Sequence, residues 1–549
     1  MMQYKLNFVF SLTILFFIFA ASWKSYGYAE IHYTFFGYSL ISRNYPEIIV
    51  DAPWRIEPNE PIPIVCIIKD ADRYPINLER ITARCKIGNS ELFSKEILSK
   101  SLFINEHYWY KVEYIDLLSS PNENLELSVE VEFIRNGKRK IITTDNLPGL
   151  SHKPLNIFMS PCNLPTFDGW YYGDAHYHSD MTQDQVEFGA PSAVAMAMGK
   201  ALGLNWLAVV DHSYDLDVAI GEFFKHDSEL TRWQTVQRDA ELINSQNDNF
   251  FIIPAEEVSC GNCNNHNIHL LAFNVPEFIP GKGDGVKRGL NRKPDLTLSQ
   301  SIRKIKEMGG FAFAAHPEEG NGFMGRLLLK RGHWHYEDYI ADGYSGLQFW
   351  NGKQDKKLYK SRQIWIRLLL EGYKPYILAG NDAHGDFNRC RGVKYPNTKL
   401  KELDNHVFGK IRTYAYCGNN FSLSGILSAI KNGNTIATNG PIVIPAIVND
   451  NGRVANVGES ISCRRSKLII NALSSEEFGF IDKIDVYRGD IANKIENLEI
   501  TLKPDLSFDK HKFVHEIECK NNSYIRLEAR SLVGNEEYLC FTNPIWLLT

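Results

Sequence analysis

The stretch Trp170-Tyr-Tyr-Gly-Asp-Ala-His-Tyr-His decides the expected fold, because a short apolar run ends there in two histidines, His176 and His178. Five later apolar runs likewise carry a histidine or a carboxylate at or near one end. Short, continuously apolar runs of this kind are typical of strands buried on both faces. The five runs are Trp206-Leu-Ala-Val-Val-Asp-His, Phe250-Phe-Ile-Ile-Pro-Ala-Glu-Glu, Asn267-Ile-His-Leu-Leu-Ala-Phe, Phe311-Ala-Phe-Ala-Ala-His-Pro and Tyr376-Ile-Leu-Ala-Gly-Asn-Asp-Ala-His.

Helical patterns separate several of these runs. We expect helices at residues 191–202, which begin with a proline, at about 228–244, at 297–308, which Gly309-Gly310 ends, and at about 357–371. Strands that alternate with helices indicate a parallel sheet. The sequence therefore predicts an α/β barrel with polar side chains gathered at one end.

The composition is that of a globular protein with small-molecule partners. The 549 residues are 44% hydrophobic, which corresponds to about three or four average domains. A formal net charge of −5 is weak for this length, and no block of five basic residues occurs. These features argue against nucleic acid and against an acidic membrane surface as partners.

The N-terminus resembles a secretory signal. Lys5 precedes the apolar stretch from Phe8 to Ala21, and Gly27-Tyr-Ala29 offers the small residues that a signal peptidase needs. We expect a signal peptide at 1–29 and a secreted, periplasmic or cell-surface protein. In the alternative, an uncleaved segment would anchor the chain to a membrane.

Three domains are expected after the signal peptide. Residues 30–160 alternate short β-rich runs with turn clusters, which predicts a β-sandwich. Residues 166–440 contain the barrel, and residues 441–549 return to short strands that predict a second β-sandwich.

Ten cysteines would allow disulfides in an exported protein. Their connectivity cannot be read from the sequence. Cys260-Gly-Asn-Cys263 lacks the second CxxC of a zinc knuckle and the preceding strand of a thioredoxin-like motif. A local disulfide or two free thiols is the favoured interpretation.

The chemistry is expected in the middle segment. His176 and His178 are two residues apart on an extended chain, so both imidazoles lie on one face and reach one metal ion together. Any one of the polar residues at the strand ends has an ordinary structural explanation. Burying all of them without a cation would be costly, so the set predicts a metal cluster.

These residues also carry a family resemblance over about 220 residues. His176-Tyr-His178 followed by Asp184, Val210-Asp-His212, Pro254-Ala-Glu-Glu257, His269, Ala315-His316-Pro317 and Asp382-Ala-His384 resemble in order the motifs of the PHP (polymerase and histidinol phosphatase) superfamily. Further motifs are similar to its CehA/McbA-like branch of metallohydrolases. They are Gly173-Asp174, Gln348-Phe-Trp-Asn351, Gly380-Asn-Asp-Ala-His384, Arg412-Thr413 and Thr438-Asn-Gly-Pro441.

The resemblance implies a distorted (β/α)7 barrel, flanked here by two β-sandwich-like domains, with two to three divalent ions. One ion would be bound by His176, His178, Glu257 and Asp382, a second by Glu257, His269 and His316, and a third by Asp184, His212 and His384. This sequence departs from the pattern at Glu256, where a glycine is usual, and at Asp184, which is a histidine in some relatives.

The residue types agree with metal-assisted hydrolysis. A carboxylate shared by two cations leaves room for a water molecule whose pKa the cations lower. Glu257 would be that carboxylate, Asp382 or His384 would move a proton to the leaving group, and Arg412 would contact the substrate. Imidazole and carboxylate ligands suit zinc, manganese or iron.

Three functions follow as hypotheses. The first is an exported metal-dependent hydrolase of a small ester, amide or carbamate. The second is a phosphoesterase of the same fold, favoured if basic residues such as Arg389, Arg412 and Lys353 converge on the metals. The third is a carbohydrate- or surface-binding protein whose β-sandwiches carry the function, without catalysis.

Some loop residues are weaker candidates for the site. His266, His333 and His335 are expected near its mouth, with Trp350 and Asn351 in its wall. A glycine-containing insertion at 276–294 is interpreted as a cover over the site or as a surface excursion.

Overall fold

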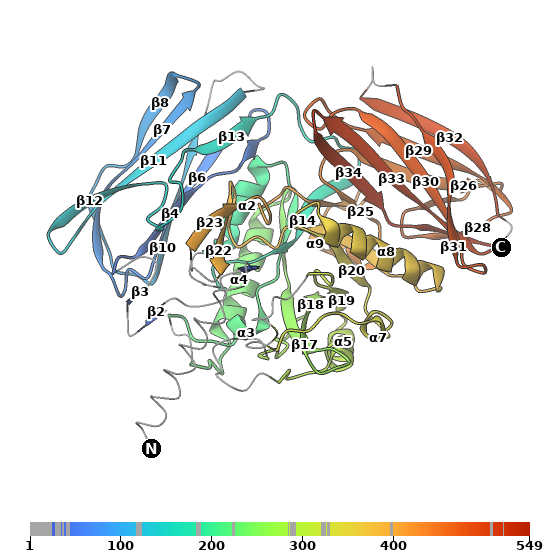
Figure 1. Ribbon diagram of the computed structural model, residues 1–549, viewed down its shortest axis with the longest axis horizontal. Helices are drawn as coiled ribbons and strands as arrows, with labels where there is room; N and C mark the ends of the chain where they lie inside the picture. The colour runs from blue at the N-terminus through green and yellow to red at the C-terminus, as the bar shows by residue number, and fades with distance from the viewer. Residues whose placement is uncertain are drawn as a thin grey trace.

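The computed structural model describes residues 25–27, 34–35, 38–39 and 44–549, except residues 117–122, 183–187, 222–224, 284, 286–292, 320–325, 327–329, 396–398, 506–508 and 520. Strands dominate the described part of the chain. The N-terminal strands lie on one side, the C-terminal strands on the other, and the central part of the chain lies between and below them (Figure 1).

Two sheets of the N-terminal region enclose an apolar core that includes Ile64, Cys66 and Val129. The opposite face of one of these strands, through Val65 and Ile67, joins the core of the central region. This double burial fixes the N-terminal sheets against the centre. The strands are β4 (Glu47–Asp51), β6 (Ile62–Lys69) and β10 (Tyr108–Ile115) in one sheet, and β5 (Arg55–Ile56), β7 (Ile76–Ile87), β8 (Ser90–Leu98), β9 (Leu102–Ile104), β11 (Glu123–Arg135), β12 (Lys138–Thr143) and β13 (Leu155–Met159) in the other.

The central region contains parts of two sheets. The first sheet begins with β16 (Phe251–Pro254), β15 (Trp206–Val209), β14 (Trp170–Tyr177), β24 (Arg412–Tyr416) and β25 (Thr435–Thr438), in that spatial order. The second sheet has the order β17 (Glu256–Gly261), β18 (Asn267–Phe273), β19 (Phe311–Ala314), β20 (Gly346–Asn351) and β21 (Tyr376–Gly380). Smaller sheets are formed by β1 (Ser25–Gly27), β22 (Cys390–Tyr395) and β23 (Lys399–Leu403), and by β2 (Thr34–Phe35) and β3 (Tyr38–Ser39).

The predicted (β/α)7 barrel is wrong. Strands β17 and β18 form an antiparallel hairpin with no helix between them, and β24 runs antiparallel to β14. The first sheet also continues through β25 into strands of the C-terminal region. The error arose because continuous apolar runs show that strands are buried but do not fix whether neighbours run parallel or antiparallel.

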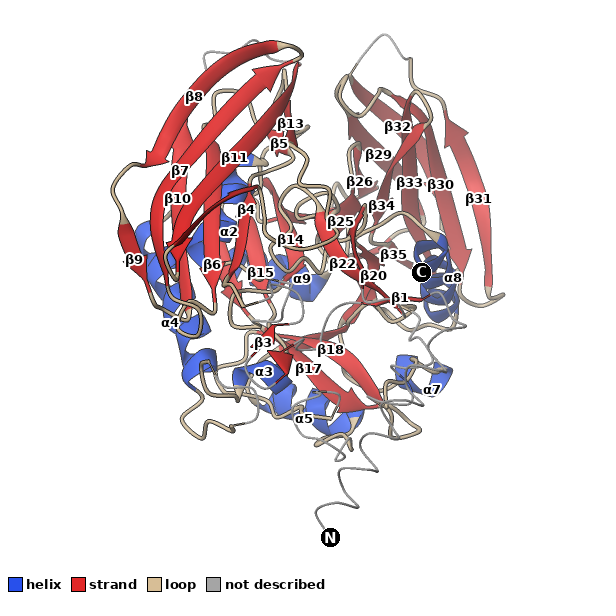
Figure 2. Ribbon diagram, turned by 60° about the vertical axis from the view of Figure 1, so that its left-hand side comes forward, coloured by secondary structure: helices blue, strands red, loops and turns tan. Residues whose placement is uncertain are grey.

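The long sheet continues as one layer of the C-terminal region, and a separate sheet forms the other layer (Figure 2). Ile447 and Leu468 from one layer and Val486 and Leu527 from the other lie in one apolar cluster. The long sheet adds β34 (Glu536–Thr542), β33 (Ser523–Val533), β30 (Ile481–Asp490), β31 (Ile495–Leu502), β28 (Ser460–Ser462) and β35 (Ile545–Leu548), and the separate sheet contains β27 (Val454–Asn456), β26 (Ile442–Asn449), β29 (Arg465–Leu473) and β32 (Lys510–Glu518).

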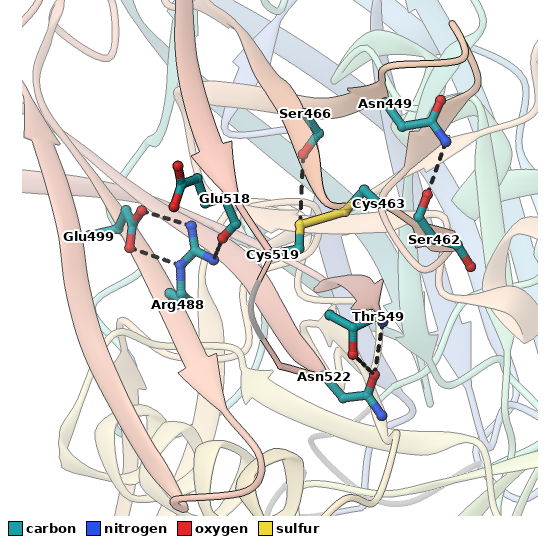
Figure 3. Close-up of a disulfide and its surroundings, with 10 residues drawn as sticks. All are labelled: Asn449, Ser462, Cys463, Ser466, Arg488, Glu499, Glu518, Cys519, Asn522 and Thr549. Carbon is teal, nitrogen blue, oxygen red and sulfur yellow. Dashed lines mark hydrogen bonds and ion pairs between the residues drawn. A yellow bond between two sulfur atoms is a disulfide. The ribbon is translucent and has the colours of Figure 1, made fainter.

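The domain boundaries stay predictions, since the long sheet spans the proposed border at residue 440. A disulfide between Cys463 and Cys519 joins the start of β29 to the end of β32 (Figure 3). Cys260 and Cys263 are not disulfide-bonded to each other.

The helices cover the central sheets, and the four predicted helices are confirmed to within a few residues. The expected helix at 297–308 is α5, whose N-cap Thr297 forms a capping box with Gln300. Its side chains Leu298, Ile302 and Ile305 face the core at helical spacing. The helices are α2 (Ser192–Ala201), α3 (Ser213–Leu216), α4 (Thr231–Gln246), α5 (Leu298–Glu307), α7 (Tyr336–Tyr339), α8 (Lys356–Leu370) and α9 (Leu423–Asn432).

Within the described residues, no helix has both the length and the apolar character needed to cross a membrane. The expected signal peptide at 1–29 lies outside the described residues except for 25–27. Export and cleavage therefore stay predictions.

Candidate metal centre

The candidate site lies where the two central sheets meet. Two isolated parallel bridges join the sheets, one between Tyr177 and Ala383 and one between His212 and Glu257. The backbone N–H of Asp382 donates to the carbonyl of His176 at 2.8 Å, and that of His178 donates to the carbonyl of Ala383 at 2.9 Å. Because the polar side chains lie near or just beyond the strand ends at this junction, the two sheets bring them together.

The junction gathers eight of the nine predicted metal ligands. They lie close enough that Nε2 of His176 and Nε2 of His178 are 3.0 Å apart. The ring of His178 lies 4.1 Å from that of His384 and 4.4 Å from that of His212, measured between centroids. The eight residues are His176, His178, His212, Glu257, His269, His316, Asp382 and His384. The ninth, Asp184, lies outside the described residues.

Glu257 lies at the centre of this cluster. Its Oε1 atom is 2.7 Å from Nδ1 of His269 and 3.0 Å from Nε2 of His316. Its Oε2 atom is 2.9 Å from Nδ1 of His212 and 3.4 Å from Nε2 of both His176 and His178. One carboxylate therefore faces five imidazole rings.

Four sets of described side chains place their ligand atoms within 4.8 Å of one another; three lie in this cluster, and the fourth, Asp70, Asp72 and His107, lies apart from it in the N-terminal region. The division differs from the one that the resemblance implied: His178 joins His212 and His384, and His212 also joins the set around His269. The sets are His176, Glu257, His316 and Asp382; His212, Glu257 and His269; and His178, His212 and His384.

The electrostatics of the cluster are unusual for a buried site. Burial disfavours the charged form of Glu257, but the surrounding histidines, led by His269, hold its pKa well below the ordinary value. Burial likewise disfavours protonated His178, yet Asp382 and Glu257 raise its pKa to about 9. For His384, burial and repulsion from His178 both lower the pKa.

The donor set fits divalent cations. Oε2 of Glu257 and Nδ1 of His212 are fully buried and face each other, but they make no hydrogen bond. Buried polar atoms that converge without hydrogen-bonding are costly unless another group satisfies them. Imidazole nitrogens and carboxylate oxygens are the ligands that zinc, manganese and iron accept.

Two of the ligands have a strained backbone. The φ angle is +55° at Asp382 and +28° at His316. Residues other than glycine rarely adopt positive φ, and such conformations concentrate at functional sites. Aspartate and histidine adopt positive φ more often than most residues, but the sequence does not show which of them do so here.

Several residues that support the ligands are part of the sequence motifs quoted above, but no role was predicted for them. Asp174 accepts hydrogen bonds from the backbone N–H of His176 and from the side chain of Asn381, so it ties the ends of β14 and β21 together. Burial raises the pKa of Asp174 to about 6. Asp211 accepts from the backbone N–H and the hydroxyl of Ser179. Their only sequence signal is a carboxylate one or two residues before a ligand histidine.

The predicted catalytic residues divide between two places. Asp382, His384 and Glu257 lie in the cluster. Arg412 does not join the metal-ligand sets: it is buried with its guanidinium near the rings of Tyr172 and Phe478. It starts β24, where its neighbour Thr413 bonds to the backbone of β21 instead.

The other basic candidates also pair elsewhere. Arg389 bonds to Glu402 and to backbone carbonyls, and Lys353 bonds to Asp404. A convergence of Arg389, Arg412 and Lys353 on the metal-ligand sets, which would favour a phosphoesterase, is not seen among the described residues.

The loop histidines are not in the metal-ligand sets found among the described residues. Nε2 of His335 lies 3.1 Å from the side-chain nitrogen of Asn264, and the backbone carbonyl of His333 accepts from Asn262. Much of the insertion at 276–294 lies outside the described residues. Its described Lys282 pairs with Asp217 at 2.7 Å, beside α3.

Comparisons with known proteins assign no family. No family model and no curated protein match the chain. Among solved structures, it is similar to a glycosyl hydrolase family 2 member from Bacteroides cellulosilyticus, at 9% identity over 92% of this chain and 63% of that chain, with a TM-score of 0.16. It is also similar to a cycloisomaltooligosaccharide glucanotransferase from Paenibacillus sp., at 8% identity over 90% of this chain and 69% of that chain, with a TM-score of 0.18. A third similar structure is a beta-glucuronidase from Parabacteroides merdae, at 10% identity over 91% of this chain and 63% of that chain, with a TM-score of 0.18.

The chain thus spans somewhat less than two thirds of the first of these structures. TM-scores of this size carry no argument about the fold or activity of this chain.

The family prediction is corrected accordingly. Membership of the PHP superfamily and of its CehA/McbA-like branch is contradicted, because the comparisons find no such relative and the central sheets are not a (β/α)7 barrel. The predicted ester, amide or carbamate hydrolase is withdrawn with it, since only the resemblance suggested those substrates. The phosphoesterase hypothesis is withdrawn for the same reason and for its missing basic residues.

Proposed function

We propose that this protein is a metal-dependent enzyme whose centre is the buried cluster around Glu257. The observation that carries the proposal is the facing of Glu257 by five imidazoles at distances of 2.7 to 3.4 Å. In coarse terms the proposed class is hydrolase, acting on a small-molecule substrate. No substrate class is assigned.

The proposed cofactors are two to three divalent ions of zinc, manganese or iron. The described ligands are those of the three sets above, with Glu257 shared by two sets and His212 shared by two. Such ions, when bound, polarise substrate oxygen atoms and lower the pKa of water. Asp184 is retained as a proposed ligand of the set that contains His212 and His384.

The side chains of this chain have distinct proposed roles. Glu257 would balance the charge of two neighbouring ions. Asp382 would hold an ion through one oxygen, since its Oδ2 accepts a hydrogen bond from Asn351 at 3.1 Å. Asp174 would hold the β14 and β21 ends in register, so that His176 and Asp382 keep their separation.

The test begins with the metal content of the full chain, purified without chelator. The proposal expects two to three divalent ions per chain, removal by chelator, and a melting temperature that rises when manganese or zinc is returned. His178→Ala should lose ions, whereas His515→Ala, on the exterior strand β32, should keep them. Finding no divalent ion in the wild-type chain would reject the proposal.

The second part is an activity screen on the loaded protein. Chromogenic glycosides, esters and phosphates would be offered to the wild type, to His178→Ala and to His515→Ala. Turnover that persists in chelated protein or in His178→Ala would place the activity outside the cluster and contradict the proposal.

A second candidate is glycan binding by the N-terminal sheets without catalysis. It is favoured by Tyr110 and Tyr114, which lie on one face of β10 with exposures of 41% and 52%. Exposed amphipathic rings suit contact with sugars, which have apolar faces and polar edges. Glycan-array binding that is abolished in a Tyr110→Ala, Tyr114→Ala double variant would support it, and equal binding by that variant would reject it.

A further inference from the structure

One set of ligands has its own chain of supporting side chains. Nδ1 of His176 lies 2.7 Å from Oε1 of Gln348. The amide nitrogen of Gln348 donates to Oδ1 of Asn351 at 2.9 Å. Because Gln348 uses its nitrogen on Asn351, its oxygen is the acceptor for His176, which leaves Nε2 of His176 as the ligand atom.

The chain continues from Asn351 to the other ligands of the same set. Nδ2 of Asn351 donates to Oδ2 of Asp382 at 3.1 Å and to Oε2 of Glu319 at 3.2 Å. The same Oε2 atom lies 3.3 Å from Nδ1 of His316. His316 therefore points Nε2 at Glu257 while its other nitrogen faces Glu319.

A lysine completes the chain at its outer end. Nζ of Lys357 donates to Oε1 of Glu319 at 2.8 Å. Lys357 lies in the first turn of α8, where the side chain of Asp355 caps its backbone N–H. The start of α8 thus fixes the ammonium group of Lys357 beside Glu319. Both carboxylate oxygens of Glu319 therefore have partners.

We propose that Gln348, Asn351, Glu319 and Lys357 form a positioning chain that sets the affinity of the cation held by His176, Glu257, His316 and Asp382. This inference rests on the proposed metal dependence. It adds that the affinity for one ion is set separately from the affinity for the others. The reason is that the four positioning residues contact three of the four ligands in that ion's set. Glu319 is a positioning residue, since it acts on the ion through His316.

The physical basis is the cost of orienting a ligand. An imidazole whose second nitrogen has a fixed polar partner, as His316 has in Oε2 of Glu319 at 3.3 Å, is held in one tautomer and one ring orientation. Loss of such a partner typically weakens metal binding by roughly 10–100-fold. The loss should be confined to the ion whose ligands the chain contacts.

The experiment is a manganese titration of the full, metal-stripped chain by calorimetry, in the wild type and in Glu319→Gln. We expect one binding event of Glu319→Gln to weaken by roughly 10–100-fold and the others to stay unchanged. Glu318→Gln is the matched control, because Glu318 is the adjacent glutamate and bonds to Tyr339 instead. It should titrate like the wild type.

Lys357 provides the rescue test. Lys357→Met should weaken the same binding event, and Lys357→Arg, which keeps the charge, should restore it. The melting temperatures of the metal-free variants distinguish a positioning role from a structural one. If the residues only position ligands, the variants should melt at the wild-type temperature.

Three outcomes would overturn the inference. They are an unchanged titration in Glu319→Gln, an equal weakening of every ion, and a weakening that Glu318→Gln reproduces. The wild-type titration separates this failure from that of the proposed function: a wild type that binds no manganese or zinc would reject both, whereas a wild type that binds them leaves only the inference to fail.

Discussion

The molecule buries charge in two regions that differ in how the charge is balanced. In the C-terminal region, fully buried Arg526 donates to both oxygens of Glu496 at 2.6 and 2.7 Å and pairs with Glu528. Arg362 of α8 also pairs with Glu528. Every charge in this network has an opposite charge within the protein.

The cluster around Glu257 is built differently. Imidazoles lie against imidazoles, as His178 does against both His212 and His384, and the carboxylates are outnumbered by rings. Protonating these rings brings like charges together, and leaving them neutral leaves Nδ1 of His212 without a hydrogen bond. The C-terminal network is complete by itself, whereas under the proposed function cations from outside would balance the central cluster.

The largest loss of stability is expected when the balanced network around Arg526 is broken. Arg526→Met should lower the free energy of unfolding by about 3–5 kcal/mol, because it leaves the part-buried carboxylate of Glu496 without its cation. Denaturation with urea, with and without chelator, measures it. The comparison predicts the same loss in both conditions, and a loss that depends on chelator would contradict it.

Removing the disulfide of the C-terminal region should lower the stability by a similar amount. Cys463 and Cys519 are 56 residues apart, and closing a loop of that length stabilises the folded state by about 4 kcal/mol in the chain-entropy model. The double variant Cys463→Ser, Cys519→Ser should melt at a lower temperature than the wild type. It should keep its full content of divalent ions, and loss of the ions would show that the two regions are coupled.

Chelation should act on the central cluster alone. Ions that bind only the folded chain stabilise it by mass action, so their removal should lower the melting temperature of the wild type. Glu257→Ala, which lacks the shared carboxylate, should show little or no change with chelator. Equal shifts in the two proteins would contradict the assignment of the site.

The smallest expected effect sharpens the contrast. In metal-free protein, His384→Leu should lower the free energy of unfolding by about 1 kcal/mol or less, because a typical hydrogen bond contributes about that much and the variant also removes the repulsion between His384 and His178. The same change in loaded protein should remove the ion of the set with His178 and His212. A large loss of stability without metal would mean that His384 is a structural partner.

The sequence predicted the members of the cluster better than the architecture around it. His176 and the other polar residues at strand ends were found because strands end at the sheet junction, which is a local property. The antiparallel β17–β18 hairpin and the continuation of β25 into β34 depend on pairing between distant segments. Apolar runs contain no information on that pairing.

The supporting residues show a second limit. Glu319 follows His316 by three residues, but only the turn after β19 brings its carboxylate to the ring, and only α8 brings Lys357 to that carboxylate. Arg412 shows the opposite error. Its place in a family-like motif suggested a substrate contact, but the alternation of side chains along β24 points it away from the cluster.

The most direct test of the central claim is an anomalous difference map from crystals of the full chain grown with manganese or zinc. The account predicts peaks inside the cluster, with one peak within about 2.0–2.2 Å of a Glu257 oxygen and of a nitrogen from His269 or His212. A map with no peak in the cluster, or with peaks only at surface carboxylates, would contradict it.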